Sequence, residues 1–155
     1  MEERLSAQDN RRSRAQETYR INQVQTASRE QLLLLTYDIG IRACFSAERA
    51  MEENDAERVN DELKRGQAVI RELMVTLRPE VAGEVGVSLM ALYEFMHGQL
   101  VEANVARDRD KIVVVRQMLE ELRSTWQEAI AALQAQQRAS EAQPQMQAGG
   151  LNFAG

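Results

Sequence analysis

Apolar residues are densest between Leu32 and Ile41, in the stretch LLLLTYDIGI, whose spacing predicts part of a long helix. At 3.6 residues per turn this helix carries two apolar stripes on different sides. The first consists of Leu32, Leu35, Ile39 and Ala43, and the second of Leu34, Tyr37, Ile41 and Phe45. In a bundle the first stripe can face the sister helices, which leaves the second to cover a fifth element or to receive a helix of another protein. Alternatively, this is simply the most buried helix of a compact bundle, and the pattern leaves both interpretations open.

The helix that carries the two stripes is predicted to span about residues 28–53. Ser28 followed by Gln31 is a capping-box pattern, in which both side chains bind free backbone N–H groups at a helix start. In the acidic segment that follows, Asn54 suits a turn and Asp55 suits the N-cap of the next helix. We therefore expect a tight helical hairpin.

The next helix is predicted to be amphipathic on one side and to end before Pro79, because residues that precede proline avoid the helical conformation. Its apolar stripe consists of Val59, Leu63, Gly66, Ile70, Leu73 and Leu77. Glycine costs about 1 kcal/mol relative to alanine inside a helix. Gly66 therefore indicates a close approach of another helix.

Two more helices follow, one from about residue 80 or 83 to 105 and one that Asp108 or Asp110 caps. The stripe of the former is Val85, Leu89, Leu92, Met96, Leu100 and Ala103, with Tyr93 to one side. The stripe of the latter is Ile112, Val115, Leu119, Leu122, Trp126, Ala129 and Leu133. Unbroken steps of three and four residues are typical of neighbouring helices that cross at about 20°.

These elements predict an all-α protein with an antiparallel up-down four-helix bundle. Residues 1–18 are polar and lack periodicity, so we expect a mobile N-terminal arm. The bundle domain then covers residues 19–138. Residues 139–155 are rich in Ala, Gln and Gly and are expected to form a disordered C-terminal tail.

Composition and charge narrow the class of protein. A formal net charge of −5 argues against general nucleic-acid binding, which needs a concentrated basic face. Cys44 is the only cysteine, so neither an internal disulfide nor a cysteine zinc site can form. The charged N-terminus lacks a signal-peptide core, and no run approaches the roughly 20 apolar residues of a membrane span. We expect a cytoplasmic protein without membrane insertion.

No catalytic or cofactor motif is evident. Glu94 and His97 have the Glu-x-x-His spacing of di-iron bundles, but such a site needs a second motif, and His97 is the only histidine. A catalytic role of Cys44 would need a histidine base that only another helix could supply. The sequence therefore predicts no enzyme, no metal and no cofactor.

Five segments occur in a characteristic order: Tyr19–Ser28 (YRINQVQTAS), Gln31–Leu33 with Tyr37 and Asp38, Leu92–Met96 (LYEFM), Leu100–Asn104 (LVEAN), and Leu119–Arg123 (LEELR) with Trp126. In this order and spacing they resemble the flagellin-specific export chaperones, the FliS family. The resemblance covers about residues 18–133. It departs from the family at His97-Gly98-Gln99, where members commonly carry basic residues.

The resemblance implies a cytoplasmic chaperone that binds the C-terminal segment of flagellin, prevents its premature polymerisation and supports its delivery to the flagellar type III export machinery. The export apparatus or a regulator would be a further partner. The alternative is a helical adaptor or regulator that binds another flagellar or secretion-system component through the same groove. A third hypothesis is that the bundle binds a small ligand or a metal ion.

The resemblance and the surplus apolar stripe together nominate client-binding residues. They are Tyr19, Asn22, Val24, Thr26, Leu33, Leu34, Tyr37, Ile41, Phe45 and Asn104. The segment around Tyr19 is expected to be a short N-terminal lid that flagellin displaces or repacks. Tyr37 could equally belong to the core, and Asn104 could equally be a helix cap.

Overall fold

The computed structural model describes the chain except for residues 1, 27, 78 and 152–155; the side chains of residues 2–5, 19–26, 79–82 and 144–151 are also outside the described part. Every element within it is an α-helix, which confirms the predicted all-α class. The helices are α1 (Glu2–Thr26), α2 (Arg29–Glu52), α3 (Ala56–Thr76), α4 (Pro79–Ala106) and α5 (Arg109–Leu151). The chain divides into two compact units, residues 1–33 and 34–155.

The first unit contains α1, a helix where the sequence predicted an arm without regular structure. Residues 2–26 contain neither glycine nor proline and are rich in Arg, Glu, Gln and Ala, which are good helix formers. The side chains from Ser6 to Thr18 are exposed, so local propensity rather than burial accounts for this helix. Helix α1 was not predicted because this segment has no apolar stripe.

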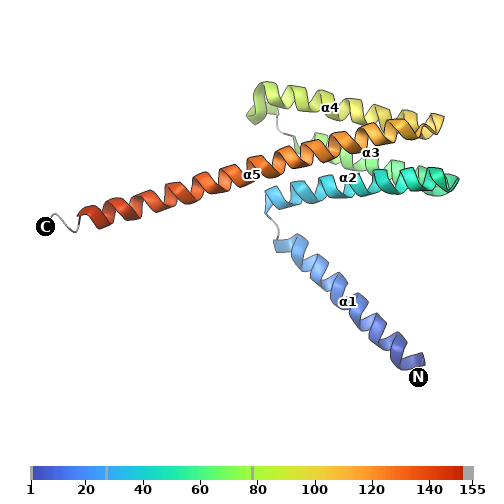
Figure 1. Cartoon of the computed structure of the whole chain (residues 1–155), viewed down its shortest axis with the longest axis horizontal. Helices are drawn as coiled ribbons and strands as arrows, with labels where there is room; N and C mark the ends of the chain where they lie inside the picture. Colours follow the sequence, from blue (N-terminus) through green and yellow to red (C-terminus); the bar gives the residue numbers. More distant parts are fainter. Residues whose placement is uncertain (1, 27, 78, 152–155) are drawn as a thin grey trace. The chain divides into compact units, whose positions relative to one another are not determined.

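In the second unit α2, α3, α4 and α5 run lengthwise beside one another (Figure 1). The largest fully enclosed side chains come from all four helices and include Tyr37, Leu63, Ile70, Leu73, Tyr93, Met96, Leu100, Ile112 and Leu119. A Cβ atom on Gly66 would lie 3.0 Å from Leu100 Cδ1, which confirms the predicted close approach, here between α3 and α4. These side chains form the core of the unit.

The helix starts follow the predicted signals. Ser28 N donates to Gln31 Oε1 and Gln31 N donates to Ser28 Oγ, both at 3.2 Å, so the capping box of α2 is formed. Asp55 Oδ1 accepts from Arg58 N at 3.2 Å at the start of α3. Asp108 Oδ1 accepts from Asp110 N at 3.1 Å, which identifies Asp108 as the cap of α5.

Three of the described residues have a positive φ, and two of them lie in turns. Asn54 (φ 56°) lies in the turn after α2, and Arg107 (φ 54°) lies in the turn between α4 and α5. Gly83 (φ 57°, ψ −132°) interrupts the helical conformation inside α4. Glycine adopts this backbone conformation without steric cost, so the interruption falls where the sequence permits it.

The predicted stripe of α3 is buried from Val59 to Leu73, while Leu77 is half-buried and follows the end of the helix. Helix α4 differs from its prediction. Val85 and Leu92 were expected in the core but are 71% and 39% exposed. Tyr93, expected to one side, is instead 2% exposed. The core face of α4 is therefore rotated towards Tyr93, because its hydroxyl group has a buried partner on α2.

The stripe of α5 is buried only along its first half. Ile112, Val115 and Leu119 are fully enclosed, Trp126 is half-buried and Leu133 is 49% exposed. The helix continues to Leu151, past the predicted start of a disordered tail at residue 139, and its side chains from 131 to 143 are exposed. The Ala- and Gln-rich composition favours this continuation locally. No helix of the described residues is long and apolar enough to cross a membrane.

Candidate functional site

The inner face of α2 consists mainly of small residues. Its buried positions are Tyr37, Gly40, Ala43, Cys44, Ala47, Glu48 and Ala50. A Cβ atom on Gly40 would lie 3.1 Å from Val69 Cγ1 and 3.2 Å from Leu119 Cδ1, so α3 and α5 both approach α2 closely there. Small residues permit this approach, and they leave little room for large side chains on the inner face.

The two stripes predicted for α2 therefore lie on either side of its buried strip. Of the first stripe only Ala43 is buried, while Leu32 and Ile39 are 39% and 44% exposed, which corrects the expectation that this stripe faces the sister helices. Of the second stripe only Tyr37 is buried. Phe45 is 45% exposed, and Leu34 and Ile41 are half-buried.

We name these two surfaces after the helices that they border. The α5-side flank consists of Leu34, Ile41 and Phe45, and the guanidinium of Arg116 on α5 lies 4.2 Å from the centre of the Phe45 ring. The α3-side flank consists of Leu35 and Ile39, and Ile39 lines a hollow together with residues of α3. Large apolar side chains thus remain accessible along both flanks of α2.

Tyr37 belongs to a buried hydrogen-bonded cluster and not to the surface of the free chain. Its hydroxyl lies 2.5 Å from the hydroxyl of Tyr93 and accepts from Trp126 Nε1 at 3.1 Å. Burial raises the pKa of Tyr37 and that of Tyr93 above their ordinary values. Both phenols are therefore neutral at physiological pH, and the cluster joins α2, α4 and α5.

An ion-pair network lies beside the exposed ring of Phe45. Arg116 Nε donates to Glu48 Oε2 at 2.7 Å, Nη2 to Glu48 Oε1 at 3.3 Å and Nη1 to Glu120 Oε1 at 3.0 Å. Glu48 is only 4% exposed, so its carboxyl group is bound by this arginine inside the unit. The network fixes the guanidinium on which the Phe45 ring rests.

Two further arginines of α5 bind acidic residues of α2. Arg123 donates to both carboxylate oxygens of Asp38, from Nε at 2.5 Å and from Nη2 at 3.2 Å. Arg109 lies 2.7 Å from Glu52. The sequence analysis missed these pairs, since charges 57 to 85 residues apart carry no local signal.

Cys44 and His97 show no arrangement for catalysis. Burial, followed by the nearby charge of Glu48, raises the pKa of Cys44 to about 12, so the thiol stays protonated. His97 Nε2 is a buried atom without a hydrogen-bond partner. Within the described residues no three His, Cys, Asp or Glu side chains are grouped to hold a metal ion.

The other residues predicted to bind the client belong neither to the α5-side flank nor to the Tyr37 cluster. Asn104 Nδ2 donates to Asn60 Oδ1 at 2.9 Å, and Asn104 Oδ1 accepts from Arg107 Nη1 at 3.2 Å, so this side chain links α4 to α3. Leu33 is half-buried. The other four residues lie in α1, but their side chains are outside the described part: Tyr19, Asn22, Val24 and Thr26.

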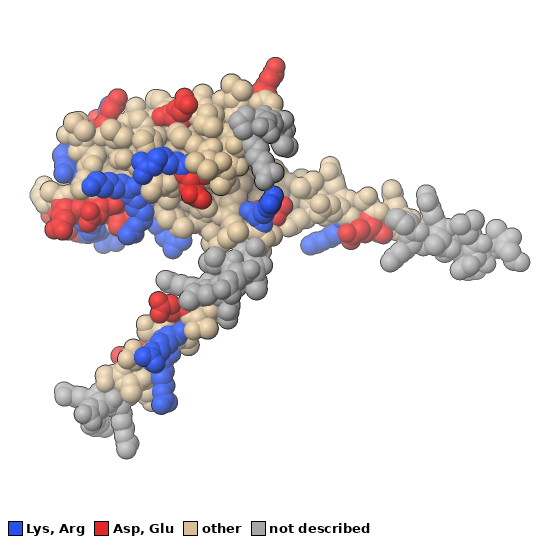
Figure 2. All heavy atoms as spheres, turned by 180° about the vertical axis from the view of Figure 1, so that it is seen from behind, with Lys and Arg blue, Asp and Glu red and all other residues tan. Residues whose placement is uncertain are grey.

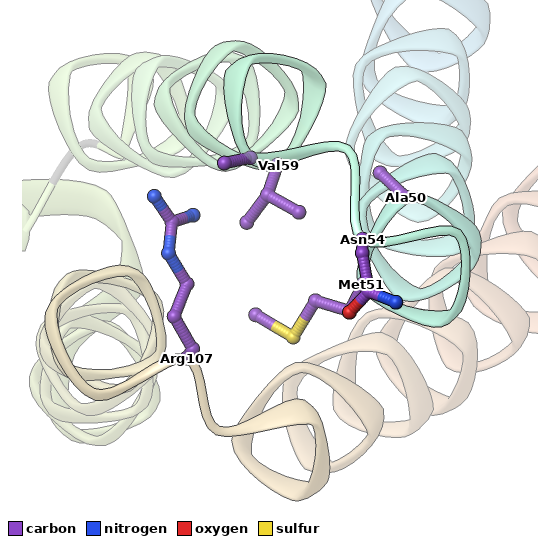
Figure 3. Close-up of a pocket in the computed structure, with 6 residues that line it drawn as sticks. Ala50, Met51, Asn54, Val59 and Arg107 are labelled. Carbon is purple, nitrogen blue, oxygen red and sulfur yellow. The ribbon is translucent and has the colours of Figure 1, made fainter.

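Two hollows open on the second unit. One of about 270 Å³ lies where the α2–α3 turn meets the α4–α5 turn and is lined by Ala50, Met51, Asn54, Ala56, Val59 and Arg107. Figure 3 shows Met51 and Val59 pointing into it, with Arg107 along the opposite side. The other, of about 330 Å³, lies between α2 and α3 and contains Ile39. Sequence periodicity does not reveal such hollows.

Comparison with known proteins places these features in context. A family model described as "Flagellar protein FliS" matches residues 11–133. A flagellar secretion chaperone FliS of Bacillus subtilis is 33% identical over 112 residues, which are 72% of this chain and 83% of that protein. A flagellar secretion chaperone FliS of Campylobacter jejuni is 32% identical over 114 residues, or 74% and 89% of the two chains.

A more distant relative and a solved structure extend the comparison. A flagellar secretion chaperone FliS of Escherichia coli is 27% identical over 108 residues, which are 69% of this chain and 79% of that protein. A structure described as "Crystal structure of flagellar chaperone from bacteria" has a TM-score of 0.64 and 20% identity, and the likeness covers 77% of this chain and 98% of that one. At this identity the structure supports the fold alone. The family match ends at Leu133, the last residue of the predicted α5 stripe.

Proposed function

The chain belongs to the FliS family of flagellar proteins, and from this premise we propose that it is an export chaperone for flagellin. In this proposal it binds the C-terminal segment of newly made flagellin in the cytoplasm and prevents premature polymerisation. It then supports delivery of that segment to the flagellar type III export machinery. FliS is a chaperone family and not a family of enzymes, in agreement with the predicted absence of catalysis.

The observation that carries this proposal is the distribution of apolar side chains on α2. An unfolded flagellin terminus has apolar helical stripes that nothing covers, and such stripes associate with one another. A chaperone can bind them by the helix-in-groove mode if it keeps large apolar side chains accessible. Phe45, with nearly half of its surface open and its ring supported by Arg116, supplies such a side chain on the α5-side flank.

Binding must also compensate for the ordering of the client. Coupled folding of a disordered segment costs about 2–5 kcal/mol, and burial of apolar surface recovers about 25 cal/mol per Å². The three residues of the α5-side flank cannot supply a large area alone. We therefore infer that the client also contacts other apolar surface, such as Leu92 and Phe95 of α4, which are 39% and 49% exposed.

The finer architecture forms part of the same proposal. We infer that α2–α5 form an antiparallel up-down four-helix bundle, which the cross-helix pairs from Asp38–Arg123 to Glu52–Arg109 support. The N-terminal segment with Tyr19, Asn22, Val24 and Thr26 is proposed as a lid that the client displaces or repacks. Tyr37 can contact a client only if its buried cluster opens.

Isothermal titration calorimetry with a peptide of the flagellin C-terminal segment tests the proposal. We expect saturable binding at micromolar concentration or tighter, with a negative heat-capacity change from apolar burial. In parallel, equimolar chain should delay flagellin polymerisation followed by light scattering. No binding at micromolar concentration, together with unchanged polymerisation, would reject flagellin as the client.

A further inference from the structure

The hollow between α2 and α3, which we name the α2–α3 groove, is a second accessible surface of the unit. It is lined by Ile39, Arg42, Ala43, Ser46, Glu62 and Arg65 and has a volume of about 330 Å³. Sites for whole small molecules span about 300–1,000 Å³, so this groove lies at the lower end. Its size suits one or two side chains of a docked segment better than an entire cofactor.

The floor of the groove is apolar and follows a helical repeat. Ile39 is 44% exposed, and Ala43, one turn further along α2, is buried beside it. Leu35, one turn before Ile39, is half-buried and continues the line. From Leu35 to Ala43 the line covers about 12 Å at 1.5 Å per residue. The two lining positions, Ile39 and Ala43, are four residues or about 6 Å apart, which a partner helix with apolar residues at positions i and i+4 matches.

The rim of the groove is basic. Arg42 is exposed and donates from Nε to the backbone oxygen of Asp38 at 3.3 Å, but among the described residues no carboxylate is paired with it. Arg65 pairs with Glu62 at 3.3 Å, and its side chain is 61% exposed. At least one positive charge at the rim is therefore not compensated. Figure 2 shows Lys and Arg side chains interspersed with Asp and Glu side chains on one face of the second unit.

Another arginine, Arg58, contacts Ser46, one of the residues that line the groove. Arg58 Nε lies 3.4 Å from Ser46 Oγ, and its Nη2 donates to Ser46 O at 3.5 Å, so its guanidinium bridges α3 to α2. Its charge is paired with Glu53 at 2.8 Å. Arg58 thus joins the two helices, whereas Arg42 is not paired with a carboxylate of the described residues, and Arg65, although paired with Glu62, keeps a side chain that is 61% exposed.

We propose that the α2–α3 groove docks an acidic amphipathic helix of a second partner protein. An apolar side chain of that helix would pack against Ile39 and Ala43, and its carboxylates would bind Arg42 and Arg65. The groove lies on the flank of α2 opposite Phe45, so the partner and the flagellin client use different surfaces. The inference goes beyond the proposed chaperone activity and does not require it.

Charge selects this kind of partner over others. The chain carries a formal charge of −5, so an acidic partner is repelled by most of the surface and attracted at this rim, which fixes where it docks. Nucleic acid would need several phosphate contacts and offers nothing to cover the apolar floor. An amphipathic helix satisfies both parts of the groove.

The test uses the full chain and a fluorescein-labelled 18-residue helical peptide, with leucines at i and i+4 flanked by glutamates. Fluorescence anisotropy should give saturable binding that weakens as salt is added. The double variant Arg42→Glu/Arg65→Glu should weaken it at least about tenfold, which corresponds to 1.4 kcal/mol. A matched control, Arg49→Glu/Lys64→Glu, makes the same charge change on exposed positions of α2 and α3 outside the groove and should stay within about twofold.

Ile39→Asp should abolish peptide binding, because it places a charge on the floor of the groove and opposite the partner's leucines. Equal losses in the two double variants, or no peptide binding at about 1 mM, would overturn the proposal. The same variants are titrated with the flagellin segment. If Arg42→Glu/Arg65→Glu also abolished flagellin binding, the groove would belong to the client site and the second partner would be rejected. Peptide binding without flagellin binding would support the groove while rejecting the chaperone proposal.

Discussion

Helices α2 and α3 differ in which of their apolar side chains are buried. Helix α3 buries large side chains, Leu63, Ile70 and Leu73 among them, and presents mostly polar groups outward. Helix α2 buries mainly glycine, alanine and cysteine, and keeps Ile39 and Phe45 nearly half exposed. The comparison shows that α3 contributes its apolar surface to the core, whereas α2 leaves much of its own exposed.

Polar pairs align α2 with α5. Glu48, Asp38 and Glu52 each bind an arginine of α5, and the Glu48–Arg116 pair is largely buried. Buried ion pairs add little net stability, yet breaking one is costly, so they fix the alignment of two helices. Helix α2 is therefore held in register by charges while its large apolar side chains stay free.

The largest expected effect is on the free energy of unfolding, and it should differ between a variant on α3 and one on α2. Leu63→Ala on α3 should lower the free energy of unfolding by about 2–5 kcal/mol, because it leaves a cavity in the core. Ile39→Ala on α2 should lower it by less than about 1 kcal/mol, since much of that side chain is already in water. Urea unfolding followed by circular dichroism measures both. Equal losses would show that Ile39 is an ordinary core residue.

Tyr37 is the one large aromatic side chain that α2 buries, and it is the exception to the small residues on the inner face of this helix. Tyr37→Phe retains the ring but leaves the Trp126 N–H without its acceptor and removes the partner of the Tyr93 hydroxyl. An unsatisfied buried polar group costs about 1–3 kcal/mol, and we expect a loss of stability in that range. Trp126 fluorescence should change in the folded variant. An unchanged unfolding midpoint would contradict the cluster.

A smaller effect concerns the thiol on the inner face of α2. Burial raises the pKa of Cys44 from 9.0 to about 12, so between these values the unfolded chain releases a proton that the folded chain keeps. The contribution of Cys44 to stability is therefore full below pH 9 and falls as pH rises. At pH 10 the loss attributable to this group is about 1 kcal/mol. Cys44→Ala should show a correspondingly shallower decline from pH 8 to 10; parallel curves would contradict the burial of the thiol.

The sequence predicted α3 well because its stripe is one-sided. The large residues Leu63, Ile70 and Leu73 face the core. The other positions of α3 are mostly polar, so the pattern offers only one possible core face. The caps at Ser28 and Asp55 were also predictable, since capping depends on residues within one turn. Helix α1 was missed because an exposed helix needs only good helix formers and no apolar stripe.

The site on α2 was predicted only in part. Large residues were taken as candidates for the core, but close packing selected the smaller ones, spaced by three and four residues at Gly40, Ala43, Ala47 and Ala50. That spacing was the signal for the true inner face. The pattern left two interpretations of this helix open, and the exposure of Phe45 favours the one with surplus apolar surface. The ion pairs and the two hollows could not be predicted, because they join residues far apart in the sequence.

The most direct test of the central claim compares two exposed apolar side chains, one on each helix. Phe45→Ser on α2 and Val75→Ser on α3 remove side chains that are 45% and 82% exposed, and neither should change the melting temperature by more than about 2 °C. In titrations with the flagellin C-terminal segment, we expect Phe45→Ser to weaken binding at least about tenfold and Val75→Ser to leave it within about twofold. Equal affinities of the two variants, or a loss of stability in Phe45→Ser as large as that in Leu63→Ala, would contradict the account.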